Sequence, residues 1–249
     1  MPVNSNKNFL EAFKDYADRY VIIGGTATSL VLHQNGFNSR STKDYDLVII
    51  EEKKDQLFYQ AFVDFIHAGG YTPNKMDEKG KLYRFRTDNP DYPTIIELFC
   101  VTPNWFSSTL RTAPVHFDED MSLSALLLDK DYYELLVKGK IIIDGYSVLA
   151  SKYLIVFKAK AWLDLTQKRE SGIGHVDSRN IRKHLNDIAR LVGALPDLNS
   201  VSLNTRVQED MVEFLEELQR RIDEIPQNED ILFEKEQIYE MLTVLFEPK

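Results

Sequence analysis

The hydrophobic pattern divides the chain into two parts. Up to about residue 147, short apolar runs typical of strands alternate with amphipathic helical segments. Beyond that point, apolar residues recur mainly at the three- and four-residue spacing of helices. The pattern predicts an α+β protein with an N-terminal α/β domain at 1–147, a mixed sheet with helices on one side, and a C-terminal helical bundle at 148–249.

Individual elements follow from the same pattern. In the first part we expect helices over 7–18 and 51–68, and strands at 21–23, 44–50, 81–87, 94–101, 124–128 and 141–143. The pattern leaves 131–137 open between a helical turn and a strand, and 103–120 shows no clear period. In the second part we expect helices at 149–165, 178–191, about 205–223 and about 229–246.

Residues 21–50 carry the first candidate chemistry. The apolar run 21–23 ends in Gly24-Gly25 and leads into a helical stretch with Thr26 and Ser29. Glycine lacks a Cβ, so a phosphate can approach the main-chain N–H groups, and the positive end of the following helix adds attraction. We therefore expect Gly24, Gly25, Thr26 and Ser29 to cradle phosphates.

Two aspartates open the next apolar run. Side chains two apart in a strand point to the same face, so Asp44 and Asp46 should project together. Paired carboxylates repel each other unless a cation lies between them, and Mg²⁺ prefers such oxygen ligands. Asp44 and Asp46 are therefore predicted to bind Mg²⁺.

The order of these features resembles a known family. The chain has, in order, a strand, Gly-Gly, a helix and then Arg40, Thr42, Asp44 and Asp46 in the spacing R-x-T-x-D-x-D. This order is similar to that of nucleotidyltransferases related to DNA polymerase β. In particular they resemble the AbiEii/AbiGii-type and MenT-like enzymes. The resemblance implies that Arg40 and Thr42 bind nucleotide.

The same resemblance implies a reaction. It is the Mg²⁺-dependent transfer of a nucleoside monophosphate from an NTP to an acceptor hydroxyl, with two metal ions and release of pyrophosphate. The acceptor would be tRNA or a protein, as in toxins of toxin–antitoxin or phage-defence systems. An antitoxin partner would then be possible, and no DNA partner is expected.

A third acid, Glu97, interrupts an apolar run from Ile95 to Val101. A buried carboxylate is costly unless a cation or hydrogen bonds accompany it. The family has a carboxylate in such a strand, more often Asp, so the resemblance makes Glu97 a metal ligand or the base that accepts the acceptor's proton. A structural salt bridge with Arg84 or Arg86 is the alternative.

Two residues of the helical part extend the resemblance. Lys158, with Lys160 as its competitor, matches a lysine that contacts the triphosphate, and Asp187 matches an aspartate at the nucleotide site. Arg190 departs from the family, where a second aspartate is common. The alternative is an interhelical surface pair between Lys158 and Asp187.

Charge is unevenly distributed. The net charge is −9, but residues 208–247 hold thirteen acidic against three basic residues, and 152–190 hold nine basic against four acidic ones. The basic stretch could meet triphosphate or RNA backbone. A solvated helix face with scattered lysines explains it equally well.

Cysteine usage and hydropathy bear on location. The single cysteine, Cys100, fits a reducing compartment, and no apolar run approaches the length of a membrane span. We therefore expect a cytoplasmic protein with no membrane partner.

Two other functions remain open. One is a nucleotidyltransferase with a small-molecule acceptor, as in antibiotic-modifying enzymes. The other is a non-catalytic module that binds a nucleotide or a partner protein, with the acidic C-terminal helices as its partner surface. The intact pair of aspartates favours an enzyme, because a binding module gains nothing from two costly carboxylates.

Overall fold

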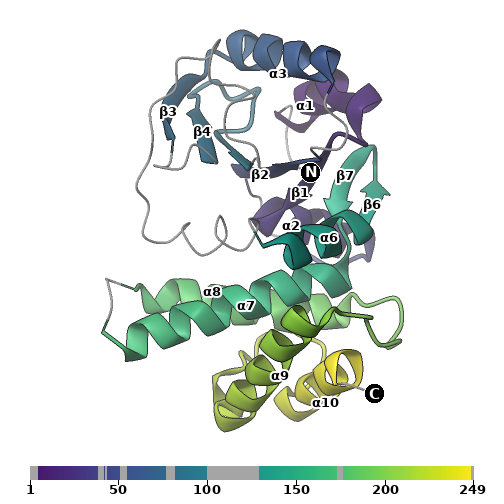
Figure 1. Cartoon of the computed structure of the whole chain (residues 1–249), viewed down its shortest axis with the longest axis vertical. Coiled ribbons are helices and arrows are strands. Elements are labelled where there is room, and N and C mark those ends of the chain that lie inside the picture. The colour runs from purple at the N-terminus through teal and green to yellow at the C-terminus, as the bar shows by residue number, and fades with distance from the viewer. Residues whose placement is uncertain are drawn as a thin grey trace. The chain divides into compact units, whose positions relative to one another are not determined.

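The computed structural model describes residues 5–38, 42, 44–50, 55–76, 82–99, 129–172 and 176–247. Its strands are β1 (Tyr20–Ile23), β2 (Asp44–Ile49), β3 (Thr72–Met76), β4 (Leu82–Arg86), β5 (Ile95–Phe99), β6 (Lys140–Ile143) and β7 (Tyr146–Leu149). Its helices are α1 (Ser5–Phe13), α2 (Gly24–Gln34), α3 (Gln56–Ala68), α6 (Lys130–Lys138), α7 (Ser151–Glu170), α8 (Ser178–Gly193), α9 (Thr205–Arg220) and α10 (Lys235–Phe246), with short 3₁₀ turns η1 (Lys14–Tyr16) and η3 (Ile222–Glu224). The fold is α+β, as predicted, with the sheet in the N-terminal part and helices in the C-terminal part (Figure 1).

Several element boundaries differ from the predictions. Helix α3 begins at Gln56 rather than 51, because the Asp55 side chain caps it by accepting a hydrogen bond from the Leu57 N–H at 2.8 Å. The open segment 131–137 is helical, because Asp129 caps α6 in the same way. Strands β3 and β7 were not predicted. Segment 103–120 and the strand predicted at 124–128 lie outside the described residues.

The described strands form one mixed sheet of seven in the order β3-β4-β5-β2-β1-β7-β6. Strand β2 pairs antiparallel with β1 and parallel with β5, while β4 and β5 are antiparallel. This order places β2 between two neighbours. The aspartates predicted at its start therefore have strands on both sides.

Helices α1 and α3 lie side by side and cover one face of the sheet (Figure 1). Phe9 of α1 packs on Tyr45 with ring centroids 4.9 Å apart, and Phe62 of α3 packs on Phe85 at 5.7 Å. Because side chains alternate along a strand, the neighbours of Tyr45 and Phe85 point to the other face. That other face carries the polar residues of interest.

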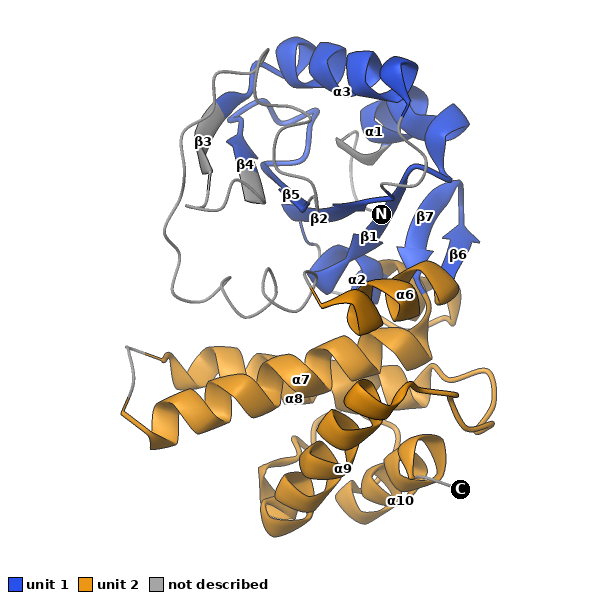
Figure 2. Ribbon diagram, viewed as in Figure 1, with its two compact units in different colours: residues 1–29, 40–117, 140–149 blue, residues 30–39, 118–139, 150–249 orange. Residues whose placement is uncertain are grey.

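The chain divides into two compact units, shown in blue and orange in Figure 2. Unit 1 comprises Met1–Ser29, Arg40–Phe117 and Lys140–Leu149, and contains the sheet. Unit 2 comprises Leu30–Ser39, Asp118–Gly139 and Ala150–Lys249. The units therefore interleave along the chain.

Unit 2 is built on α7 and α8, which lie side by side (Figure 1). Trp162 of α7 is fully buried and meets Phe214 of α9 edge to face, with centroids 5.5 Å apart. Side-chain caps begin α8 at Asp177 and α9 at Asn204. In the part of the chain that the structure describes, none of the helices combines the length and apolarity of a membrane span.

Candidate active site

A line of charged side chains crosses three neighbouring strands on the face away from α1 and α3. Asp46 of β2 lies opposite Glu97 of β5, and Glu97 lies opposite Arg84 of β4. Asp44, two residues before Asp46, pairs in register with Ile95 and is exposed. The sheet thus brings Asp44, Asp46 and Glu97, the three predicted acids, to one face near the start of β2.

Gly24 and Asp46 are in close contact. Gly24 begins α2 with a φ of 67°, a left-handed conformation that favours glycine. A Cβ at this position would overlap Oδ2 of Asp46 and lie 3.0 Å from its Cγ. The carboxylate of Asp46 therefore lies at the N-terminal end of α2, where the helix dipole stabilises negative charge.

The hydroxyl of Thr26 holds the chain that leads into β2. This side chain is buried, and its Oγ1 lies 2.9 Å from the Thr42 Oγ1 and donates to the backbone carbonyl of Asp44. One turn later, Thr28 donates to the Gly24 carbonyl at 2.8 Å. Thr26 and Thr42, both predicted to bind nucleotide, thus bind each other and fix the position of Asp44.

The remaining predicted phosphate-binding residues are Gly25, Ser29 and Arg40. Gly25 follows Gly24 in the first turn of α2, and Ser29 lies one turn further along this helix, where it is half-buried. Arg40 lies outside the described residues. The predicted role of Gly25 and Ser29 therefore rests on their place in the first two turns of α2.

Glu97 is buried and forms an ion pair. The Arg84 guanidinium donates from Nε to Oε1 of Glu97 at 2.5 Å, and its terminal nitrogen contacts the same oxygen. The exposed fraction of the Glu97 side chain is 7%. The salt-bridge alternative is therefore present, with Arg84 as the partner.

The neutral side chains on the opposite face add no competing charge. Burial raises the pKa of Tyr45 far above its usual range, and the nearby Tyr146 acts in the same direction. Burial likewise raises the pKa of Tyr146 to about 12. Both tyrosines are neutral at physiological pH, so the ionic groups of this part of β2 are Asp44 and Asp46.

Asp44 and Asp46 supply the oxygen donors that Mg²⁺ prefers. Within the described ranges, His, Cys, Asp and Glu side chains form no group of three or more placed to bind one ion. Mg²⁺, however, commonly takes only one or two protein carboxylates and completes its shell with water and substrate phosphate. The pair fits Mg²⁺, whereas Glu97 is engaged by Arg84.

Lys158 and Asp187 form an ion pair inside unit 2. Lys158 Nζ donates to Asp187 Oδ2 at 2.7 Å between α7 and α8, and the side chains are 6% and 5% exposed. The interhelical alternative is thus present, although the pair is buried and not on the surface. Each charge compensates the other in a region where an unpaired ion is costly.

Lys160 also binds carboxylates. Its Nζ lies 2.8 Å from Asp210 and 3.1 Å from Asp164, and Asp210 accepts a further hydrogen bond of 2.8 Å from the Tyr132 hydroxyl. Burial opposes the charge of Lys160, but the hydrogen bond to Asp210 and the charge of Asp164 outweigh it and raise the pKa of the lysine. This network was missed from the sequence, because its members come from α6, α7 and α9.

Arg190 is likewise buried. Its guanidinium donates to the backbone carbonyl of Asn38 and lies 3.9 Å from Asp230. Arg190, where the resembled family commonly has an aspartate, therefore binds the backbone at Asn38, two residues before Arg40. Nothing in the local sequence pointed to this contact.

No protein-family model matches the chain, and no curated protein matches it. Several solved structures align with it, among them two crystal structures. The crystal structure of JHP933 from Helicobacter pylori is 16% identical, with 97% of this chain and 88% of that chain covered, at a TM-score of 0.32. The crystal structure of the Megavirus polyadenylate synthase is 9% identical, with 96% and 47% covered, at a TM-score of 0.33.

Proposed function

We propose that the protein is a Mg²⁺-dependent nucleotidyltransferase that moves a nucleoside monophosphate from an NTP to a hydroxyl group. The observation that carries the proposal is the position of the Asp46 carboxylate. It lies against Gly24 at the start of α2, two residues from Asp44 and opposite Glu97. A phosphate-accepting turn and adjacent carboxylates are the two parts that binding of a metal triphosphate needs.

Asp44 and Asp46 would hold the metal, which when bound would neutralise phosphate charge and orient the reacting oxygens. The acceptor oxygen forms a bond to the α-phosphorus as the bond to the pyrophosphate oxygen breaks. The hydroxyl proton passes to a base, for which Glu97 is the candidate. Its neighbour Arg84 compensates the charge of Glu97 in the buried strand.

The chain's other groups would position the nucleotide. The main-chain N–H groups of Gly24 and Gly25 would face phosphate oxygens, and Thr26 would keep Asp44 in place through its carbonyl. Lys158 could contact a triphosphate only by exchanging its bond to Asp187 for one to phosphate. By the sequence resemblance, the acceptor is tRNA or a protein.

A second candidate function is a nucleotide-binding module without catalysis. The observation that favours it is that Glu97 and Lys158, two residues with predicted catalytic roles, are both in ion pairs with protein side chains. In that case nucleotide would still bind beside Gly24. No bond of the nucleotide would be broken.

One experiment separates these functions. The full chain is incubated with each labelled NTP, Mg²⁺ and total tRNA, and label is followed into RNA and into the protein. Transfer that is lost in Asp44→Asn and in Asp46→Asn, but kept in Asp64→Asn on the exposed surface of α3, supports the enzyme. Mg²⁺-dependent NTP binding without transfer supports the module, and the absence of both contradicts the site.

A further inference from the structure

Unit 2 contains a cavity that the proposed active site does not use. Its volume is about 590 Å³, within the range of small-molecule sites. It lies among the end of α7, the start of α8, η3 and the start of α10, and its apolar lining includes Trp162, Ile181, Leu185 and Ile225. These four side chains are almost fully buried and form the apolar floor of the cavity.

The carboxylates of the cavity wall already have partners. Glu224 accepts from Arg221 at 3.2 Å, and Asp223 is paired with Lys235. The Glu234 side chain accepts the N–H of Gln237 in the capping box of α10. The three carboxylates of the wall are therefore already bound by other groups of the protein.

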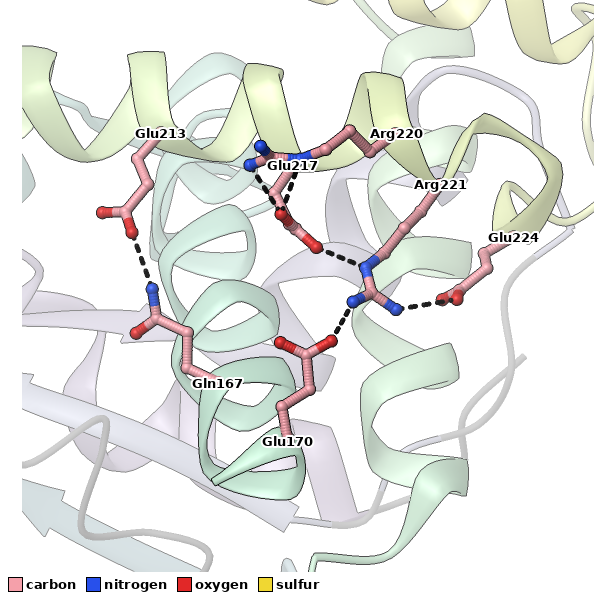
Figure 3. Close-up of polar contacts among 7 residues, drawn as sticks. All are labelled: Gln167, Glu170, Glu213, Glu217, Arg220, Arg221 and Glu224. Atoms are coloured by element: carbon pink, nitrogen blue, oxygen red, sulfur yellow. Dashed lines mark hydrogen bonds and ion pairs between the residues drawn. The ribbon is translucent and has the colours of Figure 1, made fainter. Parts of the chain in front are cut away.

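Figure 3 shows that Arg221 forms ion pairs with several nearby glutamates. Its guanidinium contacts Glu217, Glu170 and Glu224, which come from α9, α7 and η3. Glu217 also binds Arg220 at 2.8 Å. This cluster occupies the carboxylate of Glu170, the residue next to Arg169 on α7.

Two arginines of the cavity have no ion-pair partner among the described residues. Arg169 and Arg182 line it and are exposed, and neither forms an ion pair with another residue of the described ranges. Arg179, one turn earlier on α8, instead pairs with Asp177 at 2.8 Å. The cavity therefore presents two guanidinium groups that no carboxylate of the described residues engages.

We infer that this cavity binds a small organic anion, with an aromatic or apolar body on the lining and a phosphate or carboxylate group on Arg169 and Arg182. Guanidinium groups bind both oxyanions through pairs of parallel hydrogen bonds. The Ser178 hydroxyl at the cavity is a further donor. The inference is independent of the proposed active site, because it uses only residues of unit 2.

The test uses the tryptophan of the cavity as a reporter. The chain has two tryptophans, so Trp105→Phe leaves Trp162 as the sole one. Phenyl phosphate, benzoate and phenol are titrated into this variant, and binding is followed by fluorescence and by calorimetry. We expect a dissociation constant of about 1 mM for an anionic probe of this size. The preferred anion then distinguishes a phosphate ligand from a carboxylate ligand.

Variants of the arginines locate the binding. Arg169→Gln with Arg182→Gln should weaken anion binding roughly tenfold, because two charge-assisted bonds are lost. Arg179→Gln is the matched control and should leave binding unchanged. Thermal unfolding should not change in the double variant, since both side chains are exposed.

Three results would overturn the inference. Phenol could bind as tightly as the anions, which would remove the role of charge. The control Arg179→Gln could lose as much affinity as the double variant, which would indicate a general charge effect. Neither anion could bind by either method, which would mean that the cavity is not a site for this class of ligand.

Discussion

The Asp46 carboxylate occupies the space that a Cβ on Gly24 would fill. Gly24→Ala must therefore both strain a left-handed backbone and displace the carboxylate. Gly70 has nearly the same φ, 64° against 67°, but open space around it. Gly70→Ala is thus a control for backbone strain alone.

We expect Gly70→Ala to lose about 1–2 kcal/mol in the free energy of urea unfolding, the cost of a left-handed L-residue. Gly24→Ala should lose more than this and should also lose Mg²⁺-dependent NTP binding, measured by calorimetry. Equal stability and equal binding in the two variants would show that the Gly24–Asp46 contact has no role in the site.

Metal and nucleotide should stabilise the folded chain together. With Mg²⁺ and NTP at about one hundred times the dissociation constant, the free energy of unfolding should rise by about 2.7 kcal/mol. Removal of Mg²⁺ with EDTA, or the change Asp46→Asn, should abolish the rise in thermal unfolding experiments. A rise that survives in Asp46→Asn would place the nucleotide elsewhere.

The Arg84–Glu97 pair should be required for stability. Arg84→Met leaves a buried carboxylate without its cation and should cost about 3–5 kcal/mol. Arg86→Met on the same strand is the control, because Arg86 is exposed and its partner Asp88 is 3.6 Å away, and it should cost under about 1 kcal/mol. Urea unfolding of both variants makes the comparison, and similar losses would contradict the buried pair.

The Lys158–Asp187 pair allows a structural role to be separated from a catalytic one. Lys158→Met should cost about 3–5 kcal/mol, whereas Lys158→Met with Asp187→Leu should recover most of that loss because no charge stays unpaired. If Lys158 contacts the triphosphate, the stable double variant should still lack transfer activity. Full activity in the double variant would assign the pair to stability alone.

The Arg221 cluster should make stability depend on acid pH. The hydrogen bond from Arg221 holds the pKa of Glu217 below its ordinary value of 4.5. Because the folded pKa is lower than the unfolded one, this stabilisation is present above about pH 4.5 and is lost as the pH falls through the folded pKa.

Glu217→Gln should therefore lower the free energy of unfolding by no more than about 1 kcal/mol at neutral pH and flatten its decline in acid. Glu216→Gln is the matched control, since Glu216 is exposed and forms no ion pair with the described residues. The free energy of unfolding of both variants is measured by chemical unfolding between about pH 3 and pH 7, a range that covers the titration of carboxylates. Parallel curves for Glu217→Gln and the unchanged protein would contradict the expectation.

Much of the fold was predictable because it depends on local periodicity. The alternation in 44–50 and the helical spacing in 178–191 each follow from side chains a few residues apart. Asp44 and Asp46 share a face for the same reason. Strand β7, with the sequence YSVL, escaped prediction because Ser147 interrupts the continuous apolar run that marks β1 and β6.

The sequence by itself determined the α+β class, the elements with strong periodicity and the shared face of Asp44 and Asp46. Only the tertiary structure decided which groups meet. Strand register placed Glu97 beside Asp46 and gave it Arg84, and helix packing joined Lys158 to Asp187 across 29 residues. The physical reason is that periodicity is a property of neighbouring residues, whereas the partner of a buried charge is selected by the packing of distant segments.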